Sequence, residues 1–170
     1  GANASIVLTD AIPSLKNNRH LSYAKFRAAY SKSGNVNLGV YALNATYAQT
    51  AGFPYGSTAG FTAGNIIPSP DIKPEFVITK EAGIELGFLR NRINVEATYF
   101  NQTSNNQVLT VAQSWTTGYS TAIANAASFK NYGVEGDLNL TPVVRIGKGR
   151  IDLKVNATYN NNKVLSTLCD

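Results

Sequence analysis

The feature that most constrains the fold is a regular alternation of apolar and polar side chains along two segments of the chain. In residues 93–99 polar side chains alternate with apolar or aromatic ones, which are Ile93, Val95, Ala97 and Tyr99. Residues 151–159 repeat this alternation. Successive side chains of a strand point to opposite faces, whereas the same residues would be spread around a helix. Both segments are therefore predicted to be strands with one apolar face.

Weaker strand patterns bring the expected total to six strands, over residues 1–9, 22–31, 76–88, 93–99, 129–140 and 151–160. Two connections, at residues 89–92 and 141–149, are short, and two, at 32–74 and 101–128, are long. A connection of roughly 40 residues is unusual inside a compact soluble domain. Short turns on one side of a membrane and long loops on the other are typical of a transmembrane β-barrel.

The expected fold class is therefore all-β, an antiparallel transmembrane β-barrel segment in which the long connections are outer loops and the short ones inner turns. Six strands cannot close a membrane barrel, for which ~8 strands is the working minimum. We expect residues 1–170 to form a partial β-barrel domain of a larger chain.

The composition narrows the class of protein. Charged residues make up 15% of the chain, below the ~25% typical of soluble domains. No run of about 18 apolar residues occurs, which excludes a transmembrane helix. The net charge is +5, but lysine and arginine are scattered singly and form no basic run of five. We therefore expect no nucleic-acid partner.

Catalytic and metal-binding patterns are missing from the sequence. The chain has no Gly-x-Ser-x-Gly or Walker-type loop, one histidine, His20, and one cysteine, Cys169. Glu81 and Glu85 would stand ~13 Å apart along a strand, too far for the carboxylate pair of a glycosidase. No enzyme activity, metal or cofactor is expected, and a single cysteine allows no intramolecular disulfide.

Alternation within the strands also predicts which residues face the barrel lumen. A charge on the lipid side would cost a few kcal/mol near the middle of the membrane. The polar residues expected in the lumen are Glu85, Glu96, Asp137, Asp152 and Lys154.

Aromatic residues fall into two groups. Tyr30, Tyr99 and Tyr159 occur at matching strand ends, where amphipathic rings settle at the lipid interface. Trp115 and Tyr119 lie in the second long connection instead. A flat ring there can stack on a sugar or anchor a partner protein, and packing within the loop is an equally good interpretation.

Several motifs, in a consistent order, resemble the C-terminal barrel of SusC-like (RagA-like) TonB-dependent outer-membrane transporters. They are the segments 70–75 (Pro-Asp-Ile-Lys-Pro-Glu), 85–94, 99–101, 117–120 and 125–135. Each is weak alone, and their order and spacing carry the resemblance over roughly residues 21–168. Ala127 stands where the family usually has Gly, and Ser69 where it often has Asn.

The resemblance implies a large plugged barrel of ~22 strands in the outer membrane of a Gram-negative bacterium. It also implies uptake of oligosaccharides or peptides, delivered by a SusD-like surface lipoprotein and driven by TonB acting on the plug. The family's plug domain and TonB box do not occur in these 170 residues, so we expect them elsewhere in a longer chain.

Two alternatives remain open from the residues themselves. One is an outer-membrane porin without a plug, which the strands alone do not distinguish. The other is a secreted soluble β-sandwich or adhesin, which five Asn-x-Ser/Thr sites would suit, although Asn139 and Asn156 fall within expected strands. A sandwich buries its apolar face under a second sheet, whereas a barrel exposes it to lipid between aromatic residues.

Overall fold

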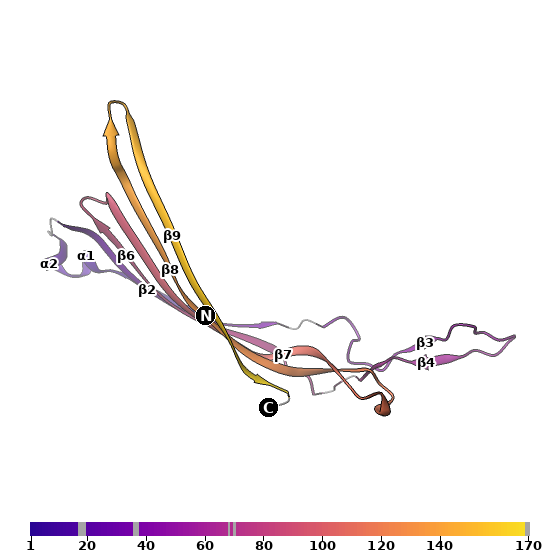
Figure 1. The fold of residues 1–170 in the computed structure, drawn as a ribbon. Helices are drawn as coiled ribbons and strands as arrows, with labels where there is room; N and C mark the ends of the chain where they lie inside the picture. Colours follow the sequence, from indigo (N-terminus) through magenta and orange to yellow (C-terminus); the bar gives the residue numbers. More distant parts are fainter. Residues whose placement is uncertain (17–19, 36–37, 68, 70, 169–170) are drawn as a thin grey trace. The chain divides into compact units, whose positions relative to one another are not determined.

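The chain is built mainly of β-strands in the computed structural model, which describes residues 1–16, 20–35, 38–67, 69 and 71–168 (Figure 1). The main strands are β1 (Ala2–Val7), β2 (Leu21–Asn35), β6 (Glu75–Phe88), β7 (Ile93–Ala112), β8 (Thr121–Ile146) and β9 (Gly149–Thr167). Three shorter strands are β3 (Tyr47–Gln49), β4 (Phe61–Ala63) and β5 (Ile66–Ile67). The helical elements are α1 (Leu8–Ala11), α2 (Pro13–Lys16) and the 3₁₀ turn η1 (Trp115–Thr117).

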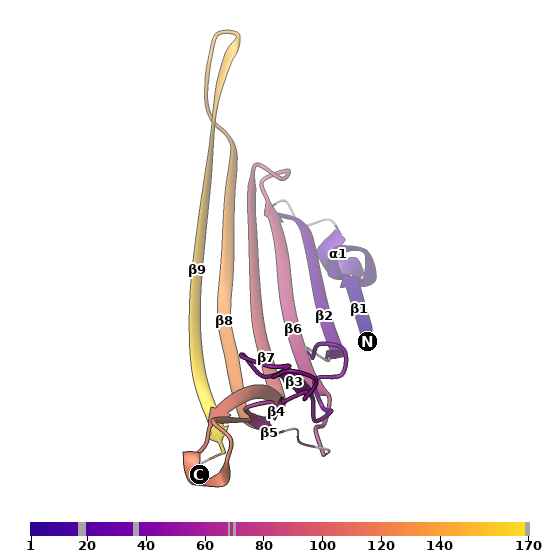
Figure 2. The ribbon, with the colours of Figure 1, turned by 90° about the vertical axis from the view of Figure 1, so that its right-hand side faces the viewer.

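A seven-stranded sheet contains all six main strands in the order β1-β2-β6-β7-β8, with β9 and β5 both pairing with β8 (Figure 2). β1 pairs antiparallel with β2, from Ala2 opposite Tyr30 to Val7 opposite Lys25. β5 adds a short parallel pair, Ile66 opposite Thr121, and β3 and β4 form a separate antiparallel hairpin. The expected all-β, antiparallel fold is confirmed, and the sheet is not closed into a barrel among the residues that the structure describes.

Two connections are much shorter than the sequence predicted. β7 continues to Ala112 and β8 begins at Thr121, so most of the loop expected at 101–128 is strand. The expected turn at 141–149 shrinks similarly, because β8 continues to Ile146 and β9 begins at Gly149. Residues 101–107 are polar at every position, so they show no period of two although the strand continues through them.

The turn expected at 89–92 lies between the end of β6 at Phe88 and the start of β7 at Ile93. Leu89, Arg90 and Asn91 have φ values of 51°, 58° and 61°, a left-handed path that is uncommon outside glycine. Neighbouring backbone holds this path, since the Leu89 amide donates to the His20 carbonyl at 2.9 Å.

Other boundaries also differ from the prediction. The first strand ends at Val7, because Pro13 starts α2 and the Ile12 amide closes a helical turn on the Leu8 carbonyl at 2.9 Å. The connection expected at 32–74 loses its first residues to β2 and carries β3, β4 and β5. Cys169 and Pro70 lie outside the described residues.

The chain divides into two compact units. Residues 1–33, 77–103 and 129–163 form one, here the strand unit, and residues 34–76, 104–128 and 164–170 form the other, the loop unit. Among the described residues the buried apolar side chains are Ala24, 2% exposed, and Ala126, 7% exposed. The large apolar side chains of the described residues are therefore exposed or half-buried. No described helix is long and apolar enough to cross a membrane.

Candidate functional site

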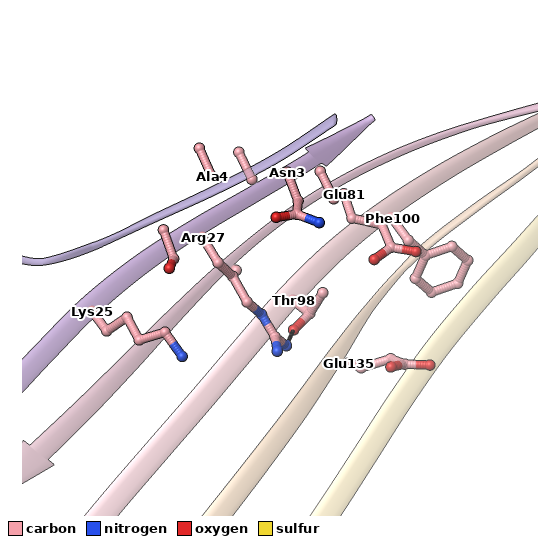
Figure 3. Close-up of a pocket in the computed structure, with 12 residues that line it drawn as sticks. Asn3, Ala4, Lys25, Arg27, Glu81, Thr98, Phe100 and Glu135 are labelled. Atoms are coloured by element: carbon pink, nitrogen blue, oxygen red, sulfur yellow. Dashed lines mark hydrogen bonds between the residues drawn. The ribbon is translucent and has the colours of Figure 1, made fainter. Parts of the chain in front are cut away.

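Arg27 of β2 is the centre of a charged network on one face of the strand unit. Its guanidinium donates to Glu96 Oε1 at 2.6 Å and to Thr98 Oγ1 at 2.7 Å, both on β7. Figure 3 shows the Arg27 and Thr98 side chains pointing toward one another. The guanidinium also lies 4.0 Å from Glu85 of β6, which receives a 3.0 Å hydrogen bond from the Lys25 ammonium group.

The network keeps two carboxylates from facing each other unpaired. Glu85 and Glu96 lie on the strands joined by the 89–92 turn, and both contact Arg27. Like charges side by side on neighbouring strands are unfavourable, and the guanidinium between them offsets this. These side chains are 26–42% exposed, so each ion pair stabilises by only about 1 kcal/mol or less.

A hollow of ≈ 450 Å³ lies on this charged face. It is lined by Lys25 and Arg27 together with Glu81, Phe100 and Glu135, which come from neighbouring strands (Figure 3). Its walls carry charges of both signs and one aromatic ring. Such a surface suits water and polar solutes and is unsuited to lipid.

The other predicted polar residues occupy the same face. Asp137 of β8 accepts a hydrogen bond from the Asn156 amide of β9, and Asp152 pairs with Arg150 at 3.1 Å. Lys154 falls between Asp152 and Asn156 in the period of two, and Asp137 follows Glu135 in the same way. The structure therefore gathers Glu85, Glu96, Asp137, Asp152 and Lys154 on one side of the strand unit.

The opposite face of the strand unit is apolar. An open hollow of ≈ 350 Å³ is lined there by residues of four strands, including Phe26, Ile84, Tyr99 and Val134. Their exposed fractions run from 36% to 46%. Large apolar side chains are therefore exposed on this face of the strand unit, as the sequence analysis expected of a barrel.

The three predicted interface tyrosines lie near one level of this apolar face. A Cβ built on Gly136 of β8 would lie 3.9 Å from the carbonyl oxygens of both Glu96 and Ala157, so these positions are aligned across β7, β8 and β9. Tyr99 and Tyr159 follow shortly after along strands that run the same way. On β2, Tyr30 lies three residues after Arg27. The Arg27 guanidinium contacts Thr98, which precedes Tyr99 on β7, so Tyr30 and Tyr99 lie near the same level. Their exposures are 46% for Tyr30 and Tyr99 and 66% for Tyr159.

Sequence reasoning missed a fourth tyrosine on this face. Tyr132 shares its side of β8 with Val134, accepts a 3.3 Å hydrogen bond from Asn161 of β9, and has the Lys130 ammonium group 5.4 Å from its ring centroid. The sequence did contain a signal, because Tyr132 lies two residues before Val134 and a strand places both side chains on the same face. The pairing of Arg27 and Lys25 with Glu85 and Glu96 was also missed. The tight turn and the alternation together indicated this pairing.

In the loop unit Asn125 of β8 joins two of the family-like motifs. Its side-chain amide donates to the carbonyls of Lys73 and Asn106, and its oxygen accepts from the Lys73 amide, each at 2.8 Å. Glu75, 7% exposed, accepts a 2.8 Å hydrogen bond from the Val108 amide. Residues 71–75 are thus tied to β7 and β8 by side-chain bonds to backbone groups.

Trp115 and Tyr119 occupy different surroundings. Trp115 lies in η1 and is 72% exposed. Tyr119 is half-buried and lines a hollow of ≈ 330 Å³ with Tyr41 and Tyr47, whereas Trp115 does not line it. The two tyrosines that share this hollow were not predicted, because the long connection gave no strand period from which to place them. Within the described part of the chain, no cluster of His, Cys, Asp and Glu could hold a metal ion.

Curated relatives resemble this chain over most of its length. The "TonB-dependent receptor SusC" of Bacteroides thetaiotaomicron is 28% identical over 158 residues, which cover 88% of this chain and 15% of that protein. The "TonB-dependent receptor P39" of Formosa agariphila is 29% identical over 145 residues, covering 85% of this chain and 14% of that protein. The chain therefore spans about one seventh of the length of these relatives.

Solved structures share the fold. The RagAB peptide importer in its "closed-closed" state superposes with a TM-score of 0.85 at 19% identity, over 96% of this chain and 18% of that chain. Its "open-open" state gives a TM-score of 0.81 at 19% identity, over 95% of this chain and 17% of that chain. The family model described as "TonB dependent receptor-like, beta-barrel" matches residues 10–167. By that match the chain is a member of the TonB-dependent receptor-like β-barrel family.

Proposed function

We propose that this chain is part of the barrel wall of a SusC-like transporter in the outer membrane of a Gram-negative bacterium. The transporter imports oligosaccharides or peptides with a SusD-like surface lipoprotein, and TonB supplies the force through a plug domain. Membership of the receptor family and the names of the relatives, SusC and the RagAB peptide importer, support this proposal.

The observation that carries the proposal is the two-faced sheet of the strand unit. One face exposes Phe26, Ile84 and Val134, and the other holds the Arg27 network. In a membrane barrel the first face meets lipid and the second lines the lumen. Glu85, Glu96, Asp137, Asp152 and Lys154 are then lumen residues in contact with water, plug or solute.

The aromatic residues take two roles in this proposal. Tyr30, Tyr99 and Tyr159 sit at the lipid interface, supported by their common level and exposure on the apolar face. Trp115 and Tyr119 contact the solute or the lipoprotein, supported by the 72% exposure of Trp115 and the place of Tyr119 at a hollow.

The direction of the two faces is tested with adjacent cysteine substitutions in the complete receptor. Ala82→Cys lies on the apolar face and Glu81→Cys on the charged face. A fluorescent label attached to the Ala82→Cys variant should be quenched by brominated lipid, and a label attached to the Glu81→Cys variant by a water-soluble quencher. The reverse pattern, or equal quenching of both variants, would rule out the proposed orientation.

Transport is tested by uptake into cells that carry or lack the receptor gene, with radiolabelled neutral oligosaccharides and peptides as probes. Uptake of one class should need the receptor, its lipoprotein and TonB. Receptor-dependent uptake that survives loss of TonB would instead support a porin without a plug.

A further inference from the structure

The hollow of the loop unit differs from the hollow of the strand unit in charge. Its ≈ 330 Å³ is lined by no Asp, Glu, Lys, Arg or His among the described residues, although the chain carries a net charge of +5. Polar lining comes from neutral residues, among them Asn44, Thr46 and Asn65. The rest of the lining is aliphatic or aromatic, and the aliphatic part includes Val40, Ile66 and Ile123. The charged hollow, by contrast, includes Lys25 and Glu81. A ligand of this neutral hollow therefore finds its hydrogen-bond partners among amides and hydroxyls and its apolar contacts among tyrosine rings and aliphatic side chains.

Three tyrosines surround the neutral hollow. Tyr41 and Tyr47 are 74% and 70% exposed, and Tyr119 is half-buried. A tyrosine ring offers a flat apolar face and a hydroxyl that can donate or accept a hydrogen bond. Tyr41 also has φ 61°, a strained left-handed conformation for a bulky residue. The Tyr41 carbonyl accepts a hydrogen bond from the Asn44 amide at 2.9 Å, so this conformation belongs to a turn in the wall of the hollow.

Backbone hydrogen bonds hold the walls of the hollow together. The Gly64 amide donates to the Thr46 carbonyl at 3.0 Å. The Asn65 carbonyl accepts from the Ser120 amide at 3.0 Å and from the Ser120 hydroxyl at 3.2 Å. Segments far apart in the sequence are thus fixed around one concave surface. A preformed concavity is what small-ligand sites usually show, and its volume lies near the ~300 Å³ lower end of their range.

We propose that this hollow binds a ring of a neutral oligosaccharide; the proposal rests on the transport function above and chooses between its two solute classes. A pyranose presents apolar C–H faces that stack on a flat ring, and hydroxyls that pair with neutral amides and hydroxyls. A sulfated sugar or a peptide with charged groups would lose hydration there without gaining an opposite charge, which is unfavourable. The absence of lining charge is therefore the selective element, and Tyr41, Tyr47 and Tyr119 are the contact residues.

The experiment is calorimetric titration of the complete receptor in detergent. The probes are maltohexaose, xylohexaose and mannohexaose, with a sulfated oligosaccharide and a lysine-containing hexapeptide for comparison. At least one neutral hexasaccharide should bind, and Tyr41→Ala and Tyr119→Ala should each weaken it tenfold or more. Tyr119→Phe should retain most of the affinity, because it keeps the ring. Tyr55→Ala is the matched control, since Tyr55 is 81% exposed but does not line the hollow.

Three results would overturn the proposal. In the first, none of the neutral hexasaccharides binds. In the second, the peptide or the sulfated sugar binds more tightly than the neutral sugars, and Tyr119→Ala weakens that binding. In the third, a neutral hexasaccharide binds, but Tyr41→Ala and Tyr119→Ala leave its affinity unchanged. Each variant's melting temperature in detergent identifies a variant that does not fold. TonB-dependent uptake is measured on the same receptor. If uptake persists while the hollow binds no sugar, the transport role stands and this site fails; if TonB-dependent uptake is absent, the transport role fails.

Discussion

The strand unit and the loop unit are ordered in different ways. In the strand unit many equivalent positions repeat one rule, apolar on one face and polar on the other, and charges such as Arg27 and Glu96 pair across strands. In the loop unit Asn125 and Glu75 bond to backbone groups distant in sequence. The strand unit should therefore tolerate a single substitution that keeps the side chain apolar or polar as its face requires. The loop unit should be more sensitive, because single side chains hold its segments together.

The largest loss of stability is expected from a charged side chain placed on the apolar face of the strand unit. Ile84→Arg would place a charge among Phe26, Tyr99 and Val134 on the apolar face. Near the middle of a bilayer an arginine on the lipid side of a barrel costs about 2–4 kcal/mol. Glu81→Arg, on the charged face, is the matched control and should cost far less. The measurement is the free energy of unfolding in urea of the complete receptor in lipid, and equal losses for both variants would contradict the two-faced arrangement.

A smaller effect is expected where strands approach closely within the strand unit. A Cβ at Gly133 would meet the Tyr159 carbonyl oxygen and the Phe100 ring, whereas a Cβ at Gly136 has its nearest neighbours at 3.9 Å. Gly133→Ala should therefore cost about 1–3 kcal/mol through overpacking. Gly136→Ala should stay within about 0.5 kcal/mol of the parent, as substitutions without such contacts do. Chemical denaturation of both variants checks this, and a tolerated Gly133→Ala would show that the strands separate easily.

The same contrast explains how much of the structure could be predicted from the sequence. Alternation alone placed strands over 93–99 and 151–159, and the structure contains them within β7 and β9. It also placed Glu85 and Glu96 on the polar face that they share. Periodicity works here because each strand has one apolar and one polar side, and a shift by one residue would exchange them.

The same reasoning failed where side chains are alike on both faces. Residues 101–107 are polar throughout, so a loop was expected where the strand continues. The ties from Asn125 to Lys73 and Asn106 were also missed, because a side-chain bond to backbone leaves no period in the sequence. The hollow lined by Tyr41, Tyr47 and Tyr119 depends on those irregular segments and was missed for the same reason.

The tie at Asn125 gives the next prediction. Asn125→Leu removes three hydrogen bonds to Lys73 and Asn106. A buried loss of this kind costs about 1–3 kcal/mol per unsatisfied group, but water reaches Lys73 here, so we expect about 1–2 kcal/mol in total. The loss should be local, seen as faster hydrogen exchange at the Lys73 amide and faster proteolysis of residues 38–67.

Asn125→Asp provides the comparison for that variant. It keeps the oxygen that accepts from the Lys73 amide and loses the two donated bonds. Exchange at Lys73 should fall between those of the parent and Asn125→Leu. If Asn125→Leu left exchange and proteolysis unchanged, the loop unit would not depend on this residue, and the contrast between the two units would fail.

The smallest effect is expected from Arg27→Gln, although Arg27 makes the shortest ion pair of the charged network. Exposed ion pairs contribute about 1 kcal/mol or less, and Lys25 still pairs with Glu85 in this variant. The remaining cost is repulsion between Glu85 and Glu96, so adding Glu96→Gln to Arg27→Gln should restore stability instead of lowering it further. The repulsion should also weaken in salt, because the screening length falls to about 3 Å at 1 M.

A double-mutant cycle of the two substitutions, with melting temperatures measured at low and high salt, tests both effects. If the two substitutions lowered the melting temperature additively, and by the same amount at low and high salt, Arg27 would act through packing on Thr98 and not through charge. Recovery in the double variant would show that the strand unit needs balanced charge on its polar face more than it needs this one guanidinium.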